Sequence, residues 1–469
     1  MFKDGLFYIQ LFEFQQYDVL YFLLNTKSVS LFLWKSIFRN EICNVFILSI
    51  KTKLLVMLKK IPKLMLILML LGAHQNSQSQ ANFKVQIGQI DSLYSEVLQE
   101  SREIYIQLPE SFNPESDIKY PVAYILDGDV MLNALHTVHS YYSGGFMPEM
   151  ILVGISNGEH RTRDLTTSEL SERRGQAYNQ ENGEAEKFTQ FIESELIPFV
   201  EDKYPVTNYR TLIGHSYGGL FTVNTLLKHA DLFENYLAID PSMDWDDQKL
   251  LKESGEILGQ KSFDGKSLFV SLGGQLHMAD NGITIDNVMK DTTDFTLFAR
   301  SNIEFSKVVK THKENGLDFY WKFYPNDLHG TIPLPSIMDG LIEVFSWYQM
   351  EDVNKFNDPE TPKEVLYDII KRRETKLKKH FGYAVAPYPD FLFNMSGYMS
   401  MDMGNPEKAL MYFQLNTEYY PDDANTYDSL ADYYEAQNDT ENALKNVLKA
   451  YELSGSDYHK RRLEELKAR

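Results

Sequence analysis

The chain has 469 residues, a formal net charge of −20 and a sequence pI of about 5.0. Its 43% hydrophobic and 13% aromatic residues exclude a disordered chain and suffice for a large core, and its length allows two or three domains. The acidic balance argues against nucleic-acid binding, which needs clustered Lys and Arg. The single cysteine, Cys43, excludes an internal disulfide and a cysteine-based redox or zinc site.

Residues 57–81, MLKKIPKLMLILMLLGAHQNSQSQA, have the pattern of a signal peptide. Lysines precede an apolar run at 64–71, and Ser79 and Ala81 are small residues at −3 and −1 of a cleavage point. The run is far shorter than the roughly 20 apolar residues that cross a bilayer. We therefore expect an exported protein, secreted or periplasmic, that has no stable membrane anchor and begins near Asn82.

Residues 1–56 precede the methionine that opens this signal, and we interpret them as a spurious extension upstream of the true start. Their Phe, Leu, Tyr, Asn and Lys follow no clear pattern. The alternative is a membrane segment at 19–34, but the polar residues at 25–28 interrupt it.

From residue 82 to about 350, strand and helix patterns alternate. Strands are expected at 102–108, 120–126, 150–155, 211–213, 236–239, 268–272 and 319–323, and helices at 185–204, 220–227, 295–312 and 341–350. Continuous apolar runs such as 120–126 are typical of parallel strands that are buried on both faces. The pattern predicts an α/β domain with a mostly parallel sheet covered by helices on both faces.

A composition shift at 351–362 indicates a linker, and residues 363–469 are expected to form a small, all-helical second region. Ala409-Leu410 recurs as Ala443-Leu444, and Gly397 precedes Ala431 by the same interval. This interval equals the period of tetratricopeptide repeats, with one good and one degenerate copy. So few repeats rarely stand alone, and we therefore expect them to pack on the first domain.

Gly214-His215-Ser216-Tyr217-Gly218 matches G-x-S-x-G between an expected strand and an expected helix. The chain must turn sharply there, the glycines give room for the turn, and the hydroxyl of Ser216 is left exposed at the edge of the sheet. The pattern predicts Ser216 as a nucleophile.

A serine hydroxyl needs a base to take its proton, and His329 is the histidine we expect to serve. It follows the last expected strand and precedes a helix. The competing histidines are less well placed, because His277 lies one strand earlier, His312 lies in a helical pattern and His215 adjoins the nucleophile itself.

The acid of such a triad is expected after the strand at 268–272, within 273–286. Asp280 is the first carboxylate there and Asp286 the second, and Asp280 is preferred.

Two backbone amides are expected to stabilise the negative charge of a tetrahedral intermediate. One is that of Tyr217, and the other is that of Asp129 or Gly128 after the strand at 120–126. Arg161 and Arg163 follow the next strand, where a loop salt bridge is favoured over a role in holding substrate.

The segments LDGD, RTRDLT, FIESELIPFVEDKYP, GHSYGGLF and DLHGTIPLPSIMDGL together resemble the putative esterase family, which includes enterochelin-esterase-like enzymes. The resemblance spans residues 85–350. It implies an α/β-hydrolase fold and cleavage of carboxylic esters without a cofactor or metal, on siderophore or carbohydrate esters. Residues 363–469 resemble tetratricopeptide repeats more weakly.

Three hypotheses follow for function. The first is a serine esterase that cleaves a small-molecule ester through an acyl-enzyme. The second is a catalytically inert hydrolase-fold protein that binds a protein partner through its repeats. The third is another acyl transfer, by a peptidase or acyltransferase. The presence of both Ser216 and His329 favours the first.

Overall fold

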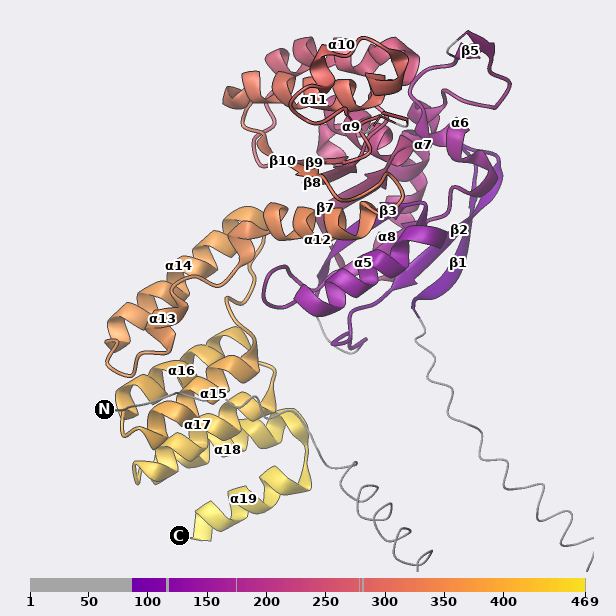
Figure 1. Cartoon of the computed structure of the whole chain (residues 1–469). Coiled ribbons are helices and arrows are strands. Elements are labelled where there is room, and N and C mark those ends of the chain that lie inside the picture. The colour runs from indigo at the N-terminus through magenta and orange to yellow at the C-terminus, as the bar shows by residue number, and fades with distance from the viewer. Residues whose placement is uncertain (1–86, 115–117, 174, 278, 281, 469) are drawn as a thin grey trace, which may run out of the picture. The chain divides into compact units, whose positions relative to one another are not determined.

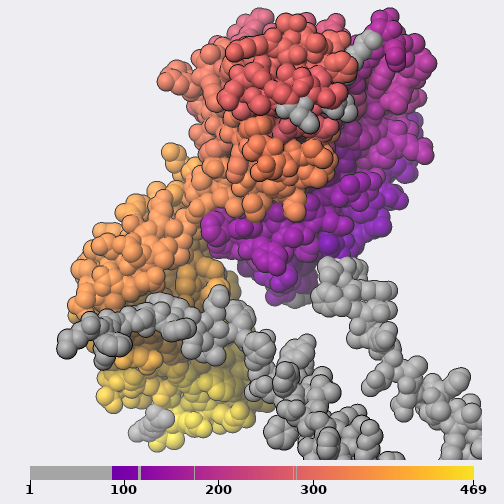
Figure 2. All heavy atoms as spheres, in the orientation of Figure 1, coloured from indigo at the N-terminus to yellow at the C-terminus, as the bar shows by residue number. Residues whose placement is uncertain are grey.

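The computed structural model describes residues 87–468 except 115–117, 174, 278 and 281 (Figures 1 and 2). The expected signal peptide at 57–81 and the extension at 1–56 lie outside the described residues. Within the described ranges, no helix combines the length and the apolar character that crossing a bilayer requires.

An eight-stranded sheet, in the order β1-β2-β4-β3-β7-β8-β9-β10, is the centre of the first domain. Its strands are β1 (Gln89–Ser95), β2 (Glu100–Gln107), β3 (Tyr120–Leu126), β4 (Ile151–Ile155), β7 (Val206–His215), β8 (Asn235–Ile239), β9 (Ser267–Gly273) and β10 (Asp318–Tyr324). β1 pairs with β2, and β2 with β4, in antiparallel fashion, while the remaining neighbours are parallel. The predicted mostly parallel sheet is confirmed.

Helices cover both faces of this sheet (Figure 1). One face packs against α5 (Gly128–Tyr142) and α12 (Pro333–Val344), and the other against α7 (Ala185–Phe191), α8 (Ile197–Lys203), α9 (Tyr217–Lys228), α10 (Trp245–Gln260) and α11 (Leu297–Thr311). Successive residues of β3 point to opposite cores, with Tyr124 in one and Ile125 in the other. Burial on both faces explains why β3, β4, β8 and β9 read as continuous apolar runs.

Several elements differ from the sequence prediction. The edge strand β1 was not expected, because its mostly exposed residues give little apolar pattern. A short hairpin of β5 (Glu172–Arg173) and β6 (Gln176–Ala177) was also not expected. The helix expected at 341–350 is instead α12, which starts at Pro333 because proline suits the first turn of a helix.

The C-terminal region is all helical in its described residues. It contains α13 (Val353–Phe356), α14 (Lys363–Phe381), α15 (Asp390–Asp402), α16 (Pro406–Tyr419), α17 (Ala424–Ala436), α18 (Thr440–Ser454) and α19 (Asp457–Ala468). The hairpins α15–α16 and α17–α18 begin at Asp390 and Ala424, which are separated by the same interval as Ala409 and Ala443. A Cβ at Gly397 would come within 2.5 Å of the Phe413 ring, so glycine lets α16 approach α15 closely.

The C-terminal end of α14 is part of the core of the first domain. Phe381 is buried, and its ring centroid lies 5.1 Å from that of Tyr209 and 5.0 Å from that of Trp347. Arg373 of the same helix donates to the carbonyl oxygens of Gln349 at 3.0 Å and Pro387 at 2.7 Å. These contacts anchor α14 to the eight-stranded sheet despite the linker that precedes it.

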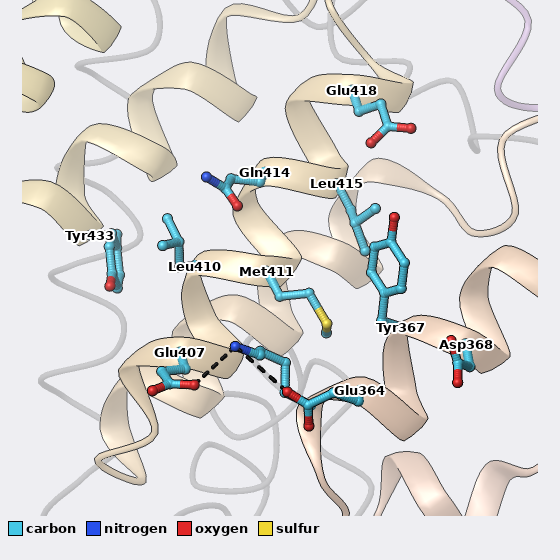
Figure 3. Close-up of a pocket in the computed structure, with 11 residues that line it drawn as sticks. Glu364, Tyr367, Asp368, Glu407, Leu410, Met411, Gln414, Leu415, Glu418 and Tyr433 are labelled. Carbon is cyan, nitrogen blue, oxygen red and sulfur yellow. Dashed lines mark hydrogen bonds and ion pairs between the residues drawn. The ribbon is translucent and has the colours of Figure 1, made fainter.

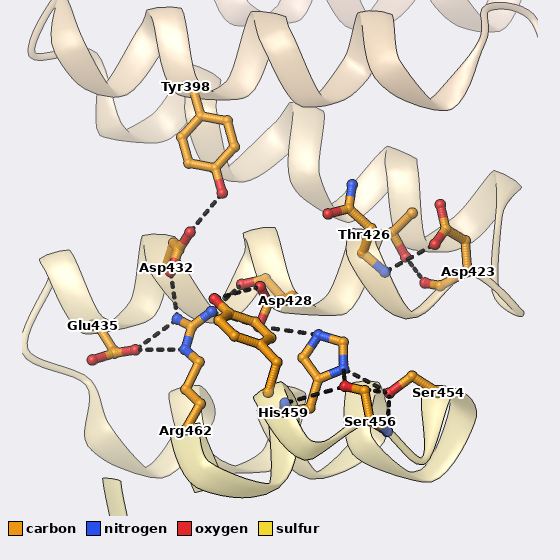
Figure 4. Close-up of polar contacts among 12 residues, drawn as sticks. Tyr398, Asp423, Thr426, Asp428, Asp432, Glu435, Ser454, Ser456, His459 and Arg462 are labelled. Atoms are coloured by element: carbon orange, nitrogen blue, oxygen red, sulfur yellow. Dashed lines mark hydrogen bonds and ion pairs between the residues drawn. The ribbon is translucent and has the colours of Figure 1, made fainter. Parts of the chain in front are cut away.

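A polar cluster fixes the last helix, α19, against α17 (Figure 4). The guanidinium of Arg462 pairs with Asp428, Asp432 and Glu435 of α17. Asp432 also accepts a hydrogen bond of 2.6 Å from the hydroxyl of Tyr398 on α15. One arginine thus satisfies three carboxylates and joins α19 to α17.

Candidate active site

The turn between β7 and α9 holds Ser216 in a rare backbone conformation, with φ 60° and ψ −114°. A Cβ at Gly214 would meet the carbonyl oxygen of Gly218 at 2.2 Å, so only glycine allows this tight crossing. The amide of Ser216 donates to Ile239 O, and the amide of Ser242 donates to Ser216 O, each at 3.0 Å. The turn is therefore fixed to the end of β8 and presents the serine hydroxyl.

Ser216, His329 and Asp240 form a continuous hydrogen-bonded chain. The Oγ of Ser216 lies 3.0 Å from Nε2 of His329, and Nδ1 of His329 lies 2.6 Å from Oδ2 of Asp240. With the proton on Nδ1, the imidazole donates to the carboxylate and leaves Nε2 free to accept from the hydroxyl. This is the geometry in which a histidine can take the proton of a serine.

Asp240 is buried, and hydrogen bonds fix the direction of its carboxylate. Its Oδ1 accepts a hydrogen bond of 3.0 Å from the amide of Gly273, at the end of β9, and its own amide donates to Ser271 O at 3.2 Å. Oδ2 is therefore aimed at His329, where it can stabilise the positive charge that the imidazole gains on protonation.

The structure brings neither Asp280 nor Asp286 to His329, and Asp240 corrects the sequence prediction of the acid. Both are exposed, and Asp280 folds back on its own loop, its amide donating to Nδ1 of His277 at 2.8 Å and its Oδ1 accepting from the amide of Gly282 at 2.8 Å. The physical reason is that the loop after β9 folds on itself and leaves Asp280 exposed, whereas Asp240, at the end of β8, lies within hydrogen-bonding distance of His329.

A sequence signal for Asp240 was present, because it directly follows the apolar strand at 236–239. β8 lies between β7 and β9 in the sheet, so its carboxyl end is beside the serine turn.

The predicted amide donors lie in different surroundings. Tyr217 is the first residue of α9, where backbone N–H groups have no partner within the helix. Asp129 instead lines a hollow with Gly88, Tyr105 and Leu132 beside β1 and β2. Its neighbour Gly128 packs directly on Gly154, where an added Cβ would come within 2.4 Å of the backbone.

Arg161 forms a bidentate pair with Asp127, with Nε–Oδ1 2.8 Å and Nη2–Oδ2 2.9 Å, and also donates to His215 O at 3.1 Å. Burial raises the pKa of Asp127, and the Arg161 guanidinium opposes that rise. Arg163 pairs with Glu100 and Asp164. The predicted loop salt bridges are confirmed, and Arg161 braces the backbone just before Ser216.

The β5–β6 hairpin contributes Arg173, which sequence reasoning missed. Its Nη1 donates to the hydroxyl of Tyr217 at 2.5 Å, Nη2 pairs with Asp244 at 3.3 Å, and its guanidinium lies 5.0 Å from the ring centroid of Trp245. The rings of Tyr217 and Trp245 meet edge to face at 5.3 Å. Buried Trp245 therefore supports Tyr217, which directly follows Ser216, and Arg173, and both of these side chains are partly exposed.

His215, Asp240 and His329 each place a potential metal-ligand atom within 4.8 Å of the others. However, Nδ1 of His329 and Oδ2 of Asp240 are only 2.6 Å apart, whereas a zinc ion between them would need about 2 Å to each atom. Burial lowers the pKa of His215 to about 4 and keeps its ring neutral. This arrangement fits proton transfer better than metal binding.

A separate cavity of about 500 Å³ lies between α14 and α16 (Figure 3). Its lining comprises Lys363, Glu364, Tyr367, Asp368, Glu407, Leu410, Met411, Gln414, Leu415, Glu418 and Tyr433. Lys363 pairs with Glu407 at 2.9 Å and with Glu364 at 3.8 Å across it. These lining residues include no serine, cysteine or histidine, so none of them could form a pair like Ser216 and His329 at the sheet edge.

Comparison with known proteins relates part of this chain to esterases. Residues 95–269 match the family described as "Putative esterase". The chain is 33% identical to the ferri-bacillibactin esterase BesA of Bacillus subtilis (strain 168) over 172 residues, which is 33% of this chain and 59% of that protein. It is 28% identical to the siderophore triacetylfusarinine C esterase of Aspergillus fumigatus, covering 33% of this chain and 56% of that protein. The chain thus spans less than two thirds of these relatives.

Two solved structures share the fold. An IroE-like serine hydrolase from Shewanella oneidensis is 27% identical, with a TM-score of 0.57 over 71% of this chain and 99% of that one. An uncharacterised protein from Capnocytophaga ochracea is 19% identical, with a TM-score of 0.53 over 81% of this chain and 99% of that one. The chain therefore has an α/β-hydrolase fold followed by an all-helical region, and its residues 95–269 resemble those of the esterase family.

Proposed function

We propose that this protein is a serine esterase that cleaves a small-molecule carboxylic ester through an acyl-enzyme. The observation that carries the proposal is the hydrogen-bonded chain from Ser216 Oγ through His329 to Asp240, at 3.0 and 2.6 Å. Esterases among the relatives, at modest identity, support a hydrolase that acts on esters.

In the first step, Ser216 Oγ attacks the ester carbonyl carbon while its proton moves to Nε2 of His329. The resulting oxyanion is stabilised by the amide of Tyr217 at the positive end of α9. The tetrahedral intermediate then breaks its bond to the alcohol oxygen, which takes the proton from Nε2. In the second step, His329 takes a proton from water, the hydroxide attacks the acyl carbon, and Ser216 Oγ leaves with that proton.

The partly exposed ring of Tyr217 and guanidinium of Arg173 suit an acyl group that carries an aromatic ring or hydroxyls. Siderophore esters are the first substrates to test, since the printed names of two relatives include such esters. Carbohydrate esters are the second.

The signal-like residues 57–81 support export of this enzyme to the periplasm or the medium, without a stable membrane anchor. Mass spectrometry of the protein purified from its native host should find an N-terminus near Asn82. A product that retained residues 1–56 would contradict both the export and the interpretation of these residues as a spurious extension.

A second candidate function is partner binding by the helical hairpins, with an inert hydrolase domain. The regular interval between the starts of α15 and α17 supports a tetratricopeptide-like array, which commonly serves protein recognition.

A fluorophosphonate probe, which labels activated serines, distinguishes the two candidates. The probe should label residues 82–469 at one site, and Ser216→Ala should abolish the labelling. Ser242→Ala is the matched control and should keep the labelling. It removes a second hydroxyl whose Oγ lies only 3.3 Å from Ser216 Oγ. Labelling that survives S216A, or a wild-type protein without labelling or turnover on a panel of esters, would favour the inert alternative.

A further inference from the structure

Helix α15 carries a line of exposed apolar side chains, which we call the Met stripe: Phe391, Met395, Met399 and Met403. They recur every four residues and therefore lie along one side of the helix. Their exposed fractions are 63%, 49%, 48% and 53%. Single exposed apolar residues are common on protein surfaces, but four in a row along one helix form a continuous patch.

The middle of the equivalent side of the next hairpin is buried. Ser429 and Tyr433 of α17 are the counterparts of Met395 and Met399 one repeat interval later, and they are only 3% and 8% exposed. Tyr433 is covered by the preceding hairpin, where it packs against Phe413 of α16 with ring centroids 6.4 Å apart. In α15, the first helix of these hairpins, no described residue covers the same side to that extent, and the Met stripe stays about half exposed.

Helix α14 does not supply that cover. Its Leu366 and Ile370 belong to one buried cluster with Phe393 of α15 and Met411 of α16, and Phe393 lies on another side of α15 than the Met stripe. The Met stripe is therefore the open end of the stack, with the shape and polarity of a surface on which one more helix would pack.

The charges at the ends of α15 and the area of the Met stripe indicate which kind of partner could cover this surface. Asp390 and Asp402 stand at the two ends of α15, which contains no lysine or arginine. A second copy would bring acidic ends together in either orientation, and like charges repel. Four half-exposed side chains of this size offer roughly 400 Å², about half of the roughly 800 Å² per partner in a stable interface. A single helix with basic ends fits both the small area of the Met stripe and the acidic ends of α15.

We propose that the Met stripe binds an amphipathic α-helix of another protein, whose apolar residues recur at helical spacing and whose ends carry lysine or arginine. Methionine side chains are flexible and polarizable, so they adapt to apolar partners of different shape. The interaction follows the helix-in-groove mode of recognition, with the partner's apolar anchors at i, i+3 or i+4 and i+7.

The test uses the chain from residue 82 to 469 and a fluorescein-labelled 16-residue peptide of leucine and lysine, with leucine at helical spacing. Fluorescence anisotropy should show saturable binding of this peptide. A peptide of the same composition without helical spacing, and one with glutamate in place of lysine, should bind at least tenfold more weakly. Hydrogen exchange should report protection at residues 390–403 when the first peptide is bound.

Variants then locate the site. Met395→Glu with Met399→Glu should weaken binding at least tenfold, whereas Met395→Leu with Met399→Leu should retain it within about threefold, because leucine keeps the surface apolar. Leu448→Glu, at an exposed apolar position of α18, is the matched control and should leave binding unchanged. Asp390→Asn with Asp402→Asn should weaken binding and reduce its salt dependence.

Three results would overturn the proposal. The first is equal binding of all peptides or protection outside 390–403. The second is a concentration-dependent dimer in sedimentation that the double glutamate variant abolishes, which would identify a second copy as the occupant. The third is binding to vesicles of phosphatidylcholine and phosphatidylglycerol that the same variant abolishes, which would identify a membrane. Ester turnover is measured in parallel, so failure of this proposal is distinguishable from failure of the proposed esterase function.

Discussion

The buried polar side chains are arranged differently at the sheet edge of the hydrolase domain and in the helical region. At the sheet edge, buried Asp240 directs one oxygen to Gly273 and the other to His329, and the chain of hydrogen bonds ends on the hydroxyl of Ser216. In the helical region, Arg462 is paired with three carboxylates of α17, and these pairs join two helices. The first arrangement is suited to chemistry and the second to holding helices together, so mutations in the two regions should affect activity and stability separately.

The largest expected effect is on turnover at the sheet edge. Ser216→Ala and His329→Ala should each lower ester turnover by about 10⁴–10⁶-fold, because a nucleophile and its base act as one unit. Thermal unfolding of both variants should stay close to that of the wild type, since neither side chain fills the core. Substantial turnover in either folded variant would remove that residue from the proposed mechanism.

The two candidate acids give the next effect. Asp240→Asn should lower turnover by about 10³–10⁴-fold, since an amide no longer stabilises the imidazolium or fixes its tautomer. Asp280→Asn, in an exposed loop, should leave turnover within about twofold. Steady-state kinetics of both purified variants on one ester decide the matter, and a larger loss in D280N than in D240N would reverse the assignment.

This contrast also shows what the sequence could and could not predict. Ser216 and the strand and helix around it form a local pattern, and the regular interval of the hairpins is also visible along the chain, so both were predictable. The acid is not local, because it depends on which strand ends lie beside the serine turn, and β8 takes that place. Arg173 was missed for a similar reason, since the hairpin that carries it has too few residues to form a pattern.

The anchoring of α14 predicts an intermediate effect on stability. Phe381→Ala should lower the free energy of unfolding by about 3–5 kcal/mol, because it leaves a cavity among the rings of Tyr209 and Trp347. Phe391→Ala is the matched control, since that phenylalanine is exposed, and it should cost under about 0.5 kcal/mol. Urea unfolding followed by circular dichroism at 222 nm, to which both regions contribute, measures both variants, and equal values would mean that α14 is not anchored in this core.

The smallest expected effect is a difference in acid sensitivity between the two regions. His139 of α5 is buried, its Nε2 accepts a hydrogen bond of 2.9 Å from the amide of Met150, and burial lowers its pKa to about 4. Residues 390–468 contain one histidine, His459. Because the folded-state pKa of His139 lies below the unfolded value of about 6.5, its contribution is fully present above pH 6.5 and is lost as the pH falls toward 4.

Between pH 7.5 and pH 5.0, that contribution should fall by about 2 kcal/mol. Tryptophan fluorescence reports on the hydrolase domain, because residues 351–469 contain no tryptophan, and circular dichroism at 222 nm adds the helical region. Lowering the pH should therefore shift the midpoint of the fluorescence transition to a lower urea concentration. The late part of the circular dichroism transition should shift by less. His139→Gln keeps an acceptor for the Met150 amide but cannot titrate. The free energy of unfolding of this variant should therefore fall much less over the same pH interval. An unchanged pH dependence in H139Q would show that other buried groups, His215 among them, dominate the acid sensitivity of the hydrolase domain.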